Sequence, residues 1–83
     1  MKAKIKGISY DVNKDHMLAG LVQNSETWET LFLNKNKENY YLLIKRYGND
    51  TVIPITQENA FHWLRKNDFQ DIIDNMDKVK GKE

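Results

Sequence analysis

Cysteine is absent from the 83-residue chain, and its absence excludes several kinds of site at once. Without a thiol there can be no disulfide, no thiolate ligand for zinc and no cysteine nucleophile. Chains that lack disulfides are typical of reducing compartments, and no apolar run here approaches the roughly 20 residues that cross a bilayer. The lysines near the amino terminus are not followed by the apolar segment of a signal peptide. We therefore expect a cytoplasmic protein that does not enter a membrane.

Glycine and proline are scarce as well, with four glycines and one proline. The glycines are dispersed and form no loop that could cradle a phosphate group. Ser9 and Ser25 lack the flanking glycines of a nucleophile elbow, and His16 and His62 lack the spacing of paired metal ligands. A chain of this length also leaves little room for a catalytic cleft. We expect no enzymatic activity, no cofactor and no metal.

An excess of one charge is the third feature that the chain lacks. Lysine and arginine number 13 against 12 aspartates and glutamates, which gives a net charge of +1. This balance is not that of a strong nucleic-acid binder or of an acidic mimic of DNA. Apolar residues make up 40% of the chain, enough for one core, and the aromatic residues must supply much of its buried area. We expect a single domain over residues 1–80, with a frayed tail at 81–83.

Alternating apolar and polar residues, separated by turn-forming segments, predict a series of short strands. The expected strands span residues 4–10, 16–23, 27–33 and 40–47, and a shorter one spans 51–55. Pro54 has no N–H group to give to a neighbouring strand, so the last strand should lie at a sheet edge or have just left the sheet.

Two helices are expected after these strands. Thr56 suits the N-cap of the first helix, and Glu58 in its first turn is favoured by the helix dipole. Asp68 is expected to cap the second helix. The apolar positions of that helix recur at spacings of three and four: Phe69, Ile72, Ile73, Met76 and Val79. The predicted fold is α+β, with a small antiparallel meander of four to five strands packed against one or two carboxy-terminal helices.

The predicted strand at 40–47 suggests a first candidate surface. Alternation places Tyr40, Leu42, Ile44 and Arg46 on one face of the strand, and this more apolar face should pack against the helices. The opposite face would then present Tyr41, Lys45 and Tyr47 outward. Exposed aromatic side chains beside lysines on a sheet are typical of proteins that stack single-stranded nucleic acid. The alternative is that these aromatic residues belong to the core.

A second candidate surface is acidic. Four aspartates recur every three residues along the predicted second helix: Asp68, Asp71, Asp74 and Asp77. Such a stripe could dock a basic partner protein. The alternative is an ordinary solvated helix face.

Residues 28–64 and the segment before them also match a known sequence pattern. Near the amino terminus the matching residues are Gly7, Tyr10, Asp11 and Asp15. In the strand region they are Glu29, Thr30, Leu31, Tyr40, Tyr41, Leu42 and Leu43. A segment of the form "IxPlteeeAxxWl" is matched by Ile53, Pro54, Thr56, Glu58, Ala60, Trp63 and Leu64. On these residues the chain resembles small, uncharacterised proteins carried by phages and mobile elements of Gram-positive bacteria. It departs from them at KRYGND, where they often have a glycine-rich loop.

This resemblance implies a biological setting and no particular reaction. The expectation is a non-enzymatic protein-interaction module of a phage or mobile element, which binds a host or element protein. One form of it would inhibit a host defence nuclease. The alternative is weak single-stranded nucleic-acid binding through the outward sheet face. A third possibility is self-association through an exposed strand edge.

Overall fold

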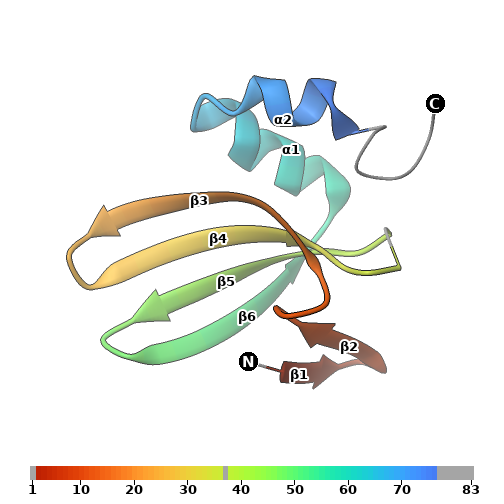
Figure 1. Cartoon of the computed structure of the whole chain (residues 1–83), viewed down its shortest axis with the longest axis vertical. Helices are drawn as coiled ribbons and strands as arrows, with labels where there is room; N and C mark the ends of the chain where they lie inside the picture. Colours follow the sequence, from red (N-terminus) through yellow and green to blue (C-terminus); the bar gives the residue numbers. More distant parts are fainter. Residues whose placement is uncertain (1, 37, 77–83) are drawn as a thin grey trace.

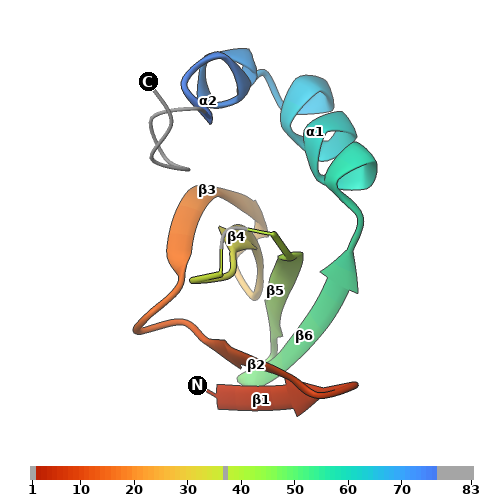
Figure 2. The ribbon, with the colours of Figure 1, turned by 90° about the vertical axis from the view of Figure 1, so that its right-hand side faces the viewer.

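The computed structural model describes residues 2–36 and 38–76 of the chain. The elements in chain order are β1 (Lys2–Ile5), β2 (Ile8–Asp11), β3 (His16–Asn24), β4 (Thr27–Leu33), β5 (Tyr40–Arg46), β6 (Asn49–Ile55), α1 (Gln57–Lys66) and α2 (Gln70–Asp74). Figures 1 and 2 show three layers, with the helices on one side of the β3–β6 sheet and the β1–β2 hairpin on the other. The predicted α+β class is confirmed.

The amino-terminal segment is a hairpin, whereas the sequence predicted one strand over 4–10. Lys6 and Gly7 form the turn, with φ of 51° and 82°. Positive φ at both central residues is the geometry of the two-residue turn whose twist matches that of paired strands. The same geometry recurs at Tyr47 and Gly48, with φ of 51° and 79°. The predicted strand over 40–47 therefore ends one residue early, and β6 begins at Asn49 rather than at Thr51.

The four-stranded sheet is an antiparallel meander in the order β3-β4-β5-β6. Pro54 lies in β6, at an edge of the sheet, as predicted. The other edge strand, β3, pairs irregularly with β4 between Met17 and Ala19 and again between Val22 and Asn24. Both edges are thus interrupted, which makes them poor templates for pairing with another chain.

The two helices are joined by a tight turn in which Asp68 has a different role from the one predicted. The hydroxyl of Thr56 accepts a 3.1 Å hydrogen bond from the Asn59 N–H, which confirms Thr56 as the N-cap of α1. Asp68 does not cap α2: its φ is 65°, and its N–H donates to the Arg65 carbonyl at 3.2 Å. With the Phe69 N–H bonded to the Leu64 carbonyl at 2.8 Å, this pattern is the Schellman motif that ends a helix.

This motif places the start of the second helix one residue later than predicted. The N-cap of α2 is Phe69, and the helix itself covers only Gln70–Asp74. The expected apolar positions Ile72 and Ile73 do face the core, and Met76 is buried. Val79 and Asp77 lie outside the described residues.

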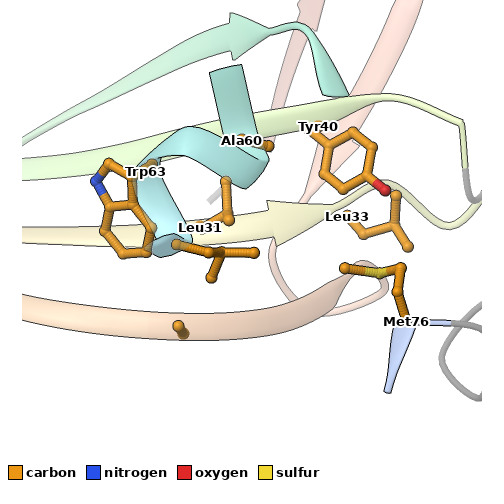
Figure 3. Close-up of a cluster of buried hydrophobic side chains, with 8 residues drawn as sticks. Leu31, Leu33, Tyr40, Ala60, Trp63 and Met76 are labelled. Carbon is orange, nitrogen blue, oxygen red and sulfur yellow. The ribbon is translucent and has the colours of Figure 1, made fainter. Parts of the chain in front are cut away.

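The apolar residues form two clusters, one on each face of the sheet, where the sequence analysis expected one core. The helix-side cluster consists of Ala19, Leu31, Leu33, Tyr40, Ala60, Trp63, Leu64 and Met76. Figure 3 shows Trp63 and Ala60 of α1 beside Leu31, with Met76 near Leu33 and Tyr40. The hairpin-side cluster consists of Tyr10, Phe32, Tyr41 and Leu43. The chain neighbours Tyr40 and Tyr41 are therefore both buried, in different clusters.

Candidate functional site

The hairpin-side layer is held to the sheet through the carboxylate of Asp15, in the connection between β2 and β3. Four donors reach this carboxylate: the Tyr41 hydroxyl at 2.7 Å, the Asp11 N–H at 2.8 Å, the Lys35 N–H at 2.8 Å and the Asn34 amide at 3.3 Å. They come from the end of β2, from β5 and from the loop after β4. Asp15 therefore joins three segments that are distant in sequence.

Asn34 makes a second connection at the same place. Its side chain is buried, and its amide donates a 2.8 Å hydrogen bond to the carbonyl of Ser9 in β2. Its side-chain oxygen accepts from the Asn36 N–H at 3.1 Å, which shapes the loop after β4. The hairpin is thus tied to the sheet by polar groups as well as by apolar packing.

The environment of Asp15 also fixes the protonation of two tyrosines. Burial, reinforced by the hydrogen bond to Asp15, raises the pKa of the Tyr41 hydroxyl far above its ordinary value of 10.0. Burial, together with the negative charge of Asp15, raises the pKa of Tyr10 as well. Both hydroxyls stay protonated at neutral pH, so Tyr41 acts as a permanent donor and not as an acid or a nucleophile.

Tyr41 therefore cannot belong to an exposed surface. Its position on the face away from the helices agrees with the strand alternation, but the side chain is 0% exposed. Its ring stacks on Phe32 at 5.1 Å between centroids and meets the edge of Tyr10 at 4.7 Å. The prediction of an outward Tyr41 is wrong because the hairpin covers this part of the sheet.

The uncovered end of the same face carries a row of side chains across all four strands. The register aligns Val22 of β3, Trp28 of β4, Lys45 of β5 and Asp50 of β6, and we call these four residues the Trp28 row. Val22 is 60% exposed and Trp28 is 42% exposed, while Lys45 and Asp50 are exposed as well. An exposed tryptophan on a sheet is unusual, because its large ring normally contributes to a core.

The other predicted residues of this surface lie near the same end. Tyr47 is 71% exposed in the β5–β6 turn, and its N–H donates a 3.1 Å hydrogen bond to the Glu26 carbonyl in the β3–β4 turn. Lys45 and Tyr47 are thus exposed as predicted, and Trp28 takes the place expected of Tyr41. The sequence signal for Trp28 was the alternation of β4, but only the register shows that it lies beside Lys45.

The described aspartates of the predicted acidic stripe lie on two different elements. Asp68 belongs to the turn after α1, while Asp71 and Asp74 belong to the short helix α2. All three are exposed, and a carboxylate oxygen of Asp74 accepts a 3.1 Å hydrogen bond from the Gln70 amide. The Schellman motif thus separates Asp68 from the helix that carries Asp71 and Asp74, and Asp77 lies outside the described residues. Binding of a partner by these carboxylates stays a prediction.

A cavity of about 350 Å³ lies beside the hairpin, at the other end of the face from the Trp28 row. We call it the lysine cavity; its lining consists of Lys2, Ala3, Lys4, Ser9, Tyr10, Asp11, Lys14 and Lys35. Sequence reasoning missed it because its four lysines come from three separate segments: Lys2 and Lys4 from β1, Lys14 from the β2–β3 connection and Lys35 from the loop after β4. The lysine-rich amino terminus is a signal for it, but the cavity also requires the turn at Lys6 and Gly7, where the sequence predicts a continuous strand.

Within residues 2–36 and 38–76, no group of three or more histidine, aspartate or glutamate side chains is placed to hold a metal ion. None of the helices in the same ranges is long and apolar enough to cross a membrane.

Comparison of the chain with protein-family models, with curated proteins and with solved structures finds no match. The Trp28 row and the lysine cavity are the two candidate binding surfaces of the described residues.

Proposed function

We propose that this protein is a non-enzymatic interaction module that binds another protein through the Trp28 row. The observation that carries the proposal is the 42% exposure of Trp28 on an open part of the sheet. Tryptophan, tyrosine and arginine are the residue types most enriched among side chains that dominate binding energy in protein interfaces. Val22 beside it, and Tyr47 in the neighbouring turn, extend the apolar area at this end of the molecule.

The charges of the row favour a protein over a nucleic acid. Lys45 lies directly opposite Asp50 in the pairing of β5 with β6, so the row carries one charge of each sign. A phosphate backbone is attracted by an uncompensated excess of positive charge, which this row does not have. A mixed apolar and charged surface around an aromatic anchor is the usual composition of a protein interface.

One specific form of the proposal is inhibition of a host defence nuclease. It is supported by the small size of the chain and by its resemblance to proteins of phages and mobile elements. In this form the partner would be a component of the nuclease complex, and the Trp28 row would cover a surface that the nuclease needs. The test is inhibition of the purified nuclease by the wild-type protein, with loss of inhibition in Trp28→Ala.

The general proposal can be tested without knowing the partner in advance. Tagged wild-type, Trp28→Ala and Ile53→Ala proteins would be used to capture partners from the native host. Ile53 is a suitable control because it is a large exposed side chain, 39% exposed, and its alternation in β6 places it on the helix side of the sheet. We expect the wild type and Ile53→Ala to retain the same protein and Trp28→Ala to lose it. Equal capture by all three proteins would contradict the proposal.

Weak binding of single-stranded nucleic acid is the second candidate, and the pairing of Trp28 with Lys45 in the register of β4 with β5 favours it. A base could stack on the indole ring while the lysine meets the adjacent phosphate. Fluorescence anisotropy of a labelled oligonucleotide at increasing salt would decide. Affinity that falls steeply with salt and is lost in both Trp28→Ala and Lys45→Ala supports it, whereas the absence of binding at low salt excludes it.

A further inference from the structure

The lysine cavity has an unusual concentration of positive charge for a protein with a net charge of +1. Four of its eight lining residues are lysines, and among the described residues Asp11 is its single acidic member. Asp11 is itself buried, and one of its carboxylate oxygens accepts a 3.0 Å hydrogen bond from the Asn13 N–H. Like charges brought together around a cavity repel one another, so an anion that binds among them relieves this repulsion.

The positions of these lysines are fixed by the backbone around them. Lys2 and Lys4 lie on β1, which pairs with β2 at Asp11 and Ser9. The N–H of Lys14 donates to the Asp11 carbonyl at 2.9 Å, and the N–H of Lys35 donates to Asp15 at 2.8 Å. The lysine backbones therefore need little rearrangement to receive a ligand, and preorganisation of this kind favours binding.

We propose that the lysine cavity binds a small molecule carrying a diphosphate group. Lysine is a common phosphate ligand because its ammonium group is a compact point charge with three donors. A phosphate monoester carries about −1.5 to −2 charges at neutral pH, so two linked phosphates nearly match four lysines offset by one carboxylate. The cavity has a volume of about 350 Å³, which lies within the roughly 300–1,000 Å³ range of small-molecule sites. This volume is larger than a single phosphate ion would fill.

This site is separate from the Trp28 row, so the inference goes beyond the proposed protein binding. Lys35 follows the carboxyl end of β4, whereas Trp28 lies near the opposite end of that strand. The two surfaces can be changed independently by substitution, and failure of one proposal leaves the other standing.

Isothermal titration calorimetry of the 83-residue chain with pyrophosphate provides the test. We expect saturable one-to-one binding at low salt that weakens as salt is added, because the attraction is electrostatic and partly exposed. Lys14→Ala and Lys35→Ala should each weaken binding at least tenfold. The matched control is Lys66→Ala, which removes an exposed lysine at the end of α1, outside the cavity lining. Circular dichroism would confirm that each variant is folded.

A second series identifies the recognised group. Adenosine diphosphate should compete with pyrophosphate, and adenosine should not. The proposal is overturned if pyrophosphate shows no saturable binding, if Lys66→Ala weakens binding as much as the cavity variants, or if adenosine binds as tightly as adenosine diphosphate. It is also overturned if a single-stranded oligonucleotide binds at the cavity lysines while pyrophosphate does not.

Discussion

The hydroxyl of Tyr41 donates a 2.7 Å hydrogen bond to the carboxylate of Asp15 and thereby links the middle of the sheet to the connection between β2 and β3. The ring of Tyr41 is fully buried and contacts Phe32 and Tyr10, so this bond forms beside the hairpin-side cluster. Since the same carboxylate also accepts from the N–H groups of Asp11 and Lys35, one side chain sets the position of the hairpin, the following loop and the lysine cavity.

Removal of the Asp15 carboxylate should destabilise the protein more than removal of its tyrosine donor. Asp15→Ala leaves the Tyr41 hydroxyl and two N–H groups without their acceptor, which should cost about 3 kcal/mol or more. Tyr41→Phe removes one donor from a carboxylate that keeps three others, and should cost about 1–2 kcal/mol. Urea denaturation followed by tryptophan fluorescence measures both. An equal or smaller effect for Asp15→Ala would contradict the central role of Asp15.

Stability should fall in alkaline solution because of the buried tyrosines. Their pKa values are raised in the folded protein, so below about pH 10 both states hold the proton and stability is at its full value. Above that pH the unfolded chain loses protons that the folded protein keeps, and the free energy of unfolding falls by about 1.4 kcal/mol per pH unit through Tyr41, to which Tyr10 adds in the same direction. Urea denaturation at pH 9 and pH 11 measures the change. Tyr41→Phe should show a smaller loss than the wild type, and an identical loss would refute the assignment.

The two hairpin turns should be sensitive to substitution of their glycines, although space is available at both. A Cβ atom at Gly7 or Gly48 would meet nothing within 4 Å, but their φ values are 82° and 79°. Gly7→Ala and Gly48→Ala should therefore each cost about 1 kcal/mol through the backbone alone. Gly20→Ala is the matched control: its φ is not in this region and its Cβ would lie 3.7 Å from the Thr30 hydroxyl oxygen, an ordinary contact. In thermal melts, Gly20→Ala should have a higher melting temperature than either Gly7→Ala or Gly48→Ala.

The protein should remain monomeric in spite of its two sheet edges. Pro54 lacks an N–H group on β6, and the pairing irregularities on β3 disturb the edge that Met17 and Val22 occupy. Analytical ultracentrifugation over a wide concentration range should show one species of monomer mass. A dimer that dissociates on dilution would instead support the self-association considered from the sequence.

The parts of the fold that could be predicted from sequence are those governed by local chemistry. Pro54 at an edge and Thr56 at a helix start follow from a missing donor and from a side-chain acceptor, and both are confirmed. The prediction that Asp68 caps the second helix was wrong because aspartate suits an N-cap and also tolerates positive φ. The same residue type is therefore compatible with the start of one helix and with the end of another. In the structure Asp68 lies at the end of α1, and the ring of the next residue, Phe69, stacks on Trp63 at 5.9 Å between centroids.

The Trp28 row and the lysine cavity were harder to predict because they depend on the pairing and register of the strands and on the position of the hairpin. Alternation correctly separated the two faces of β5 but could not show that a hairpin more than 25 residues earlier covers Tyr41 and leaves Lys45 open. Trp28 became a candidate only once the register of β4 with β5 placed it opposite Lys45. The lysine cavity required the turn at Lys6 and Gly7, which folds β1 back along β2.

Tyr40 and Tyr41 are buried in opposite clusters. The register of β5 therefore depends strongly on one polar pair, Tyr41 and Asp15. Both faces of β5 are apolar, so a slip of one residue would still bury hydrophobic side chains on each side, and burial alone discriminates weakly against it. Such a slip would carry the Tyr41 hydroxyl away from Asp15 and leave this buried phenol without its acceptor, while the carboxylate would lose one of its four donors. The bond between Asp15 and Tyr41 thus selects one alignment of the central strand from two that the hydrophobic pattern permits.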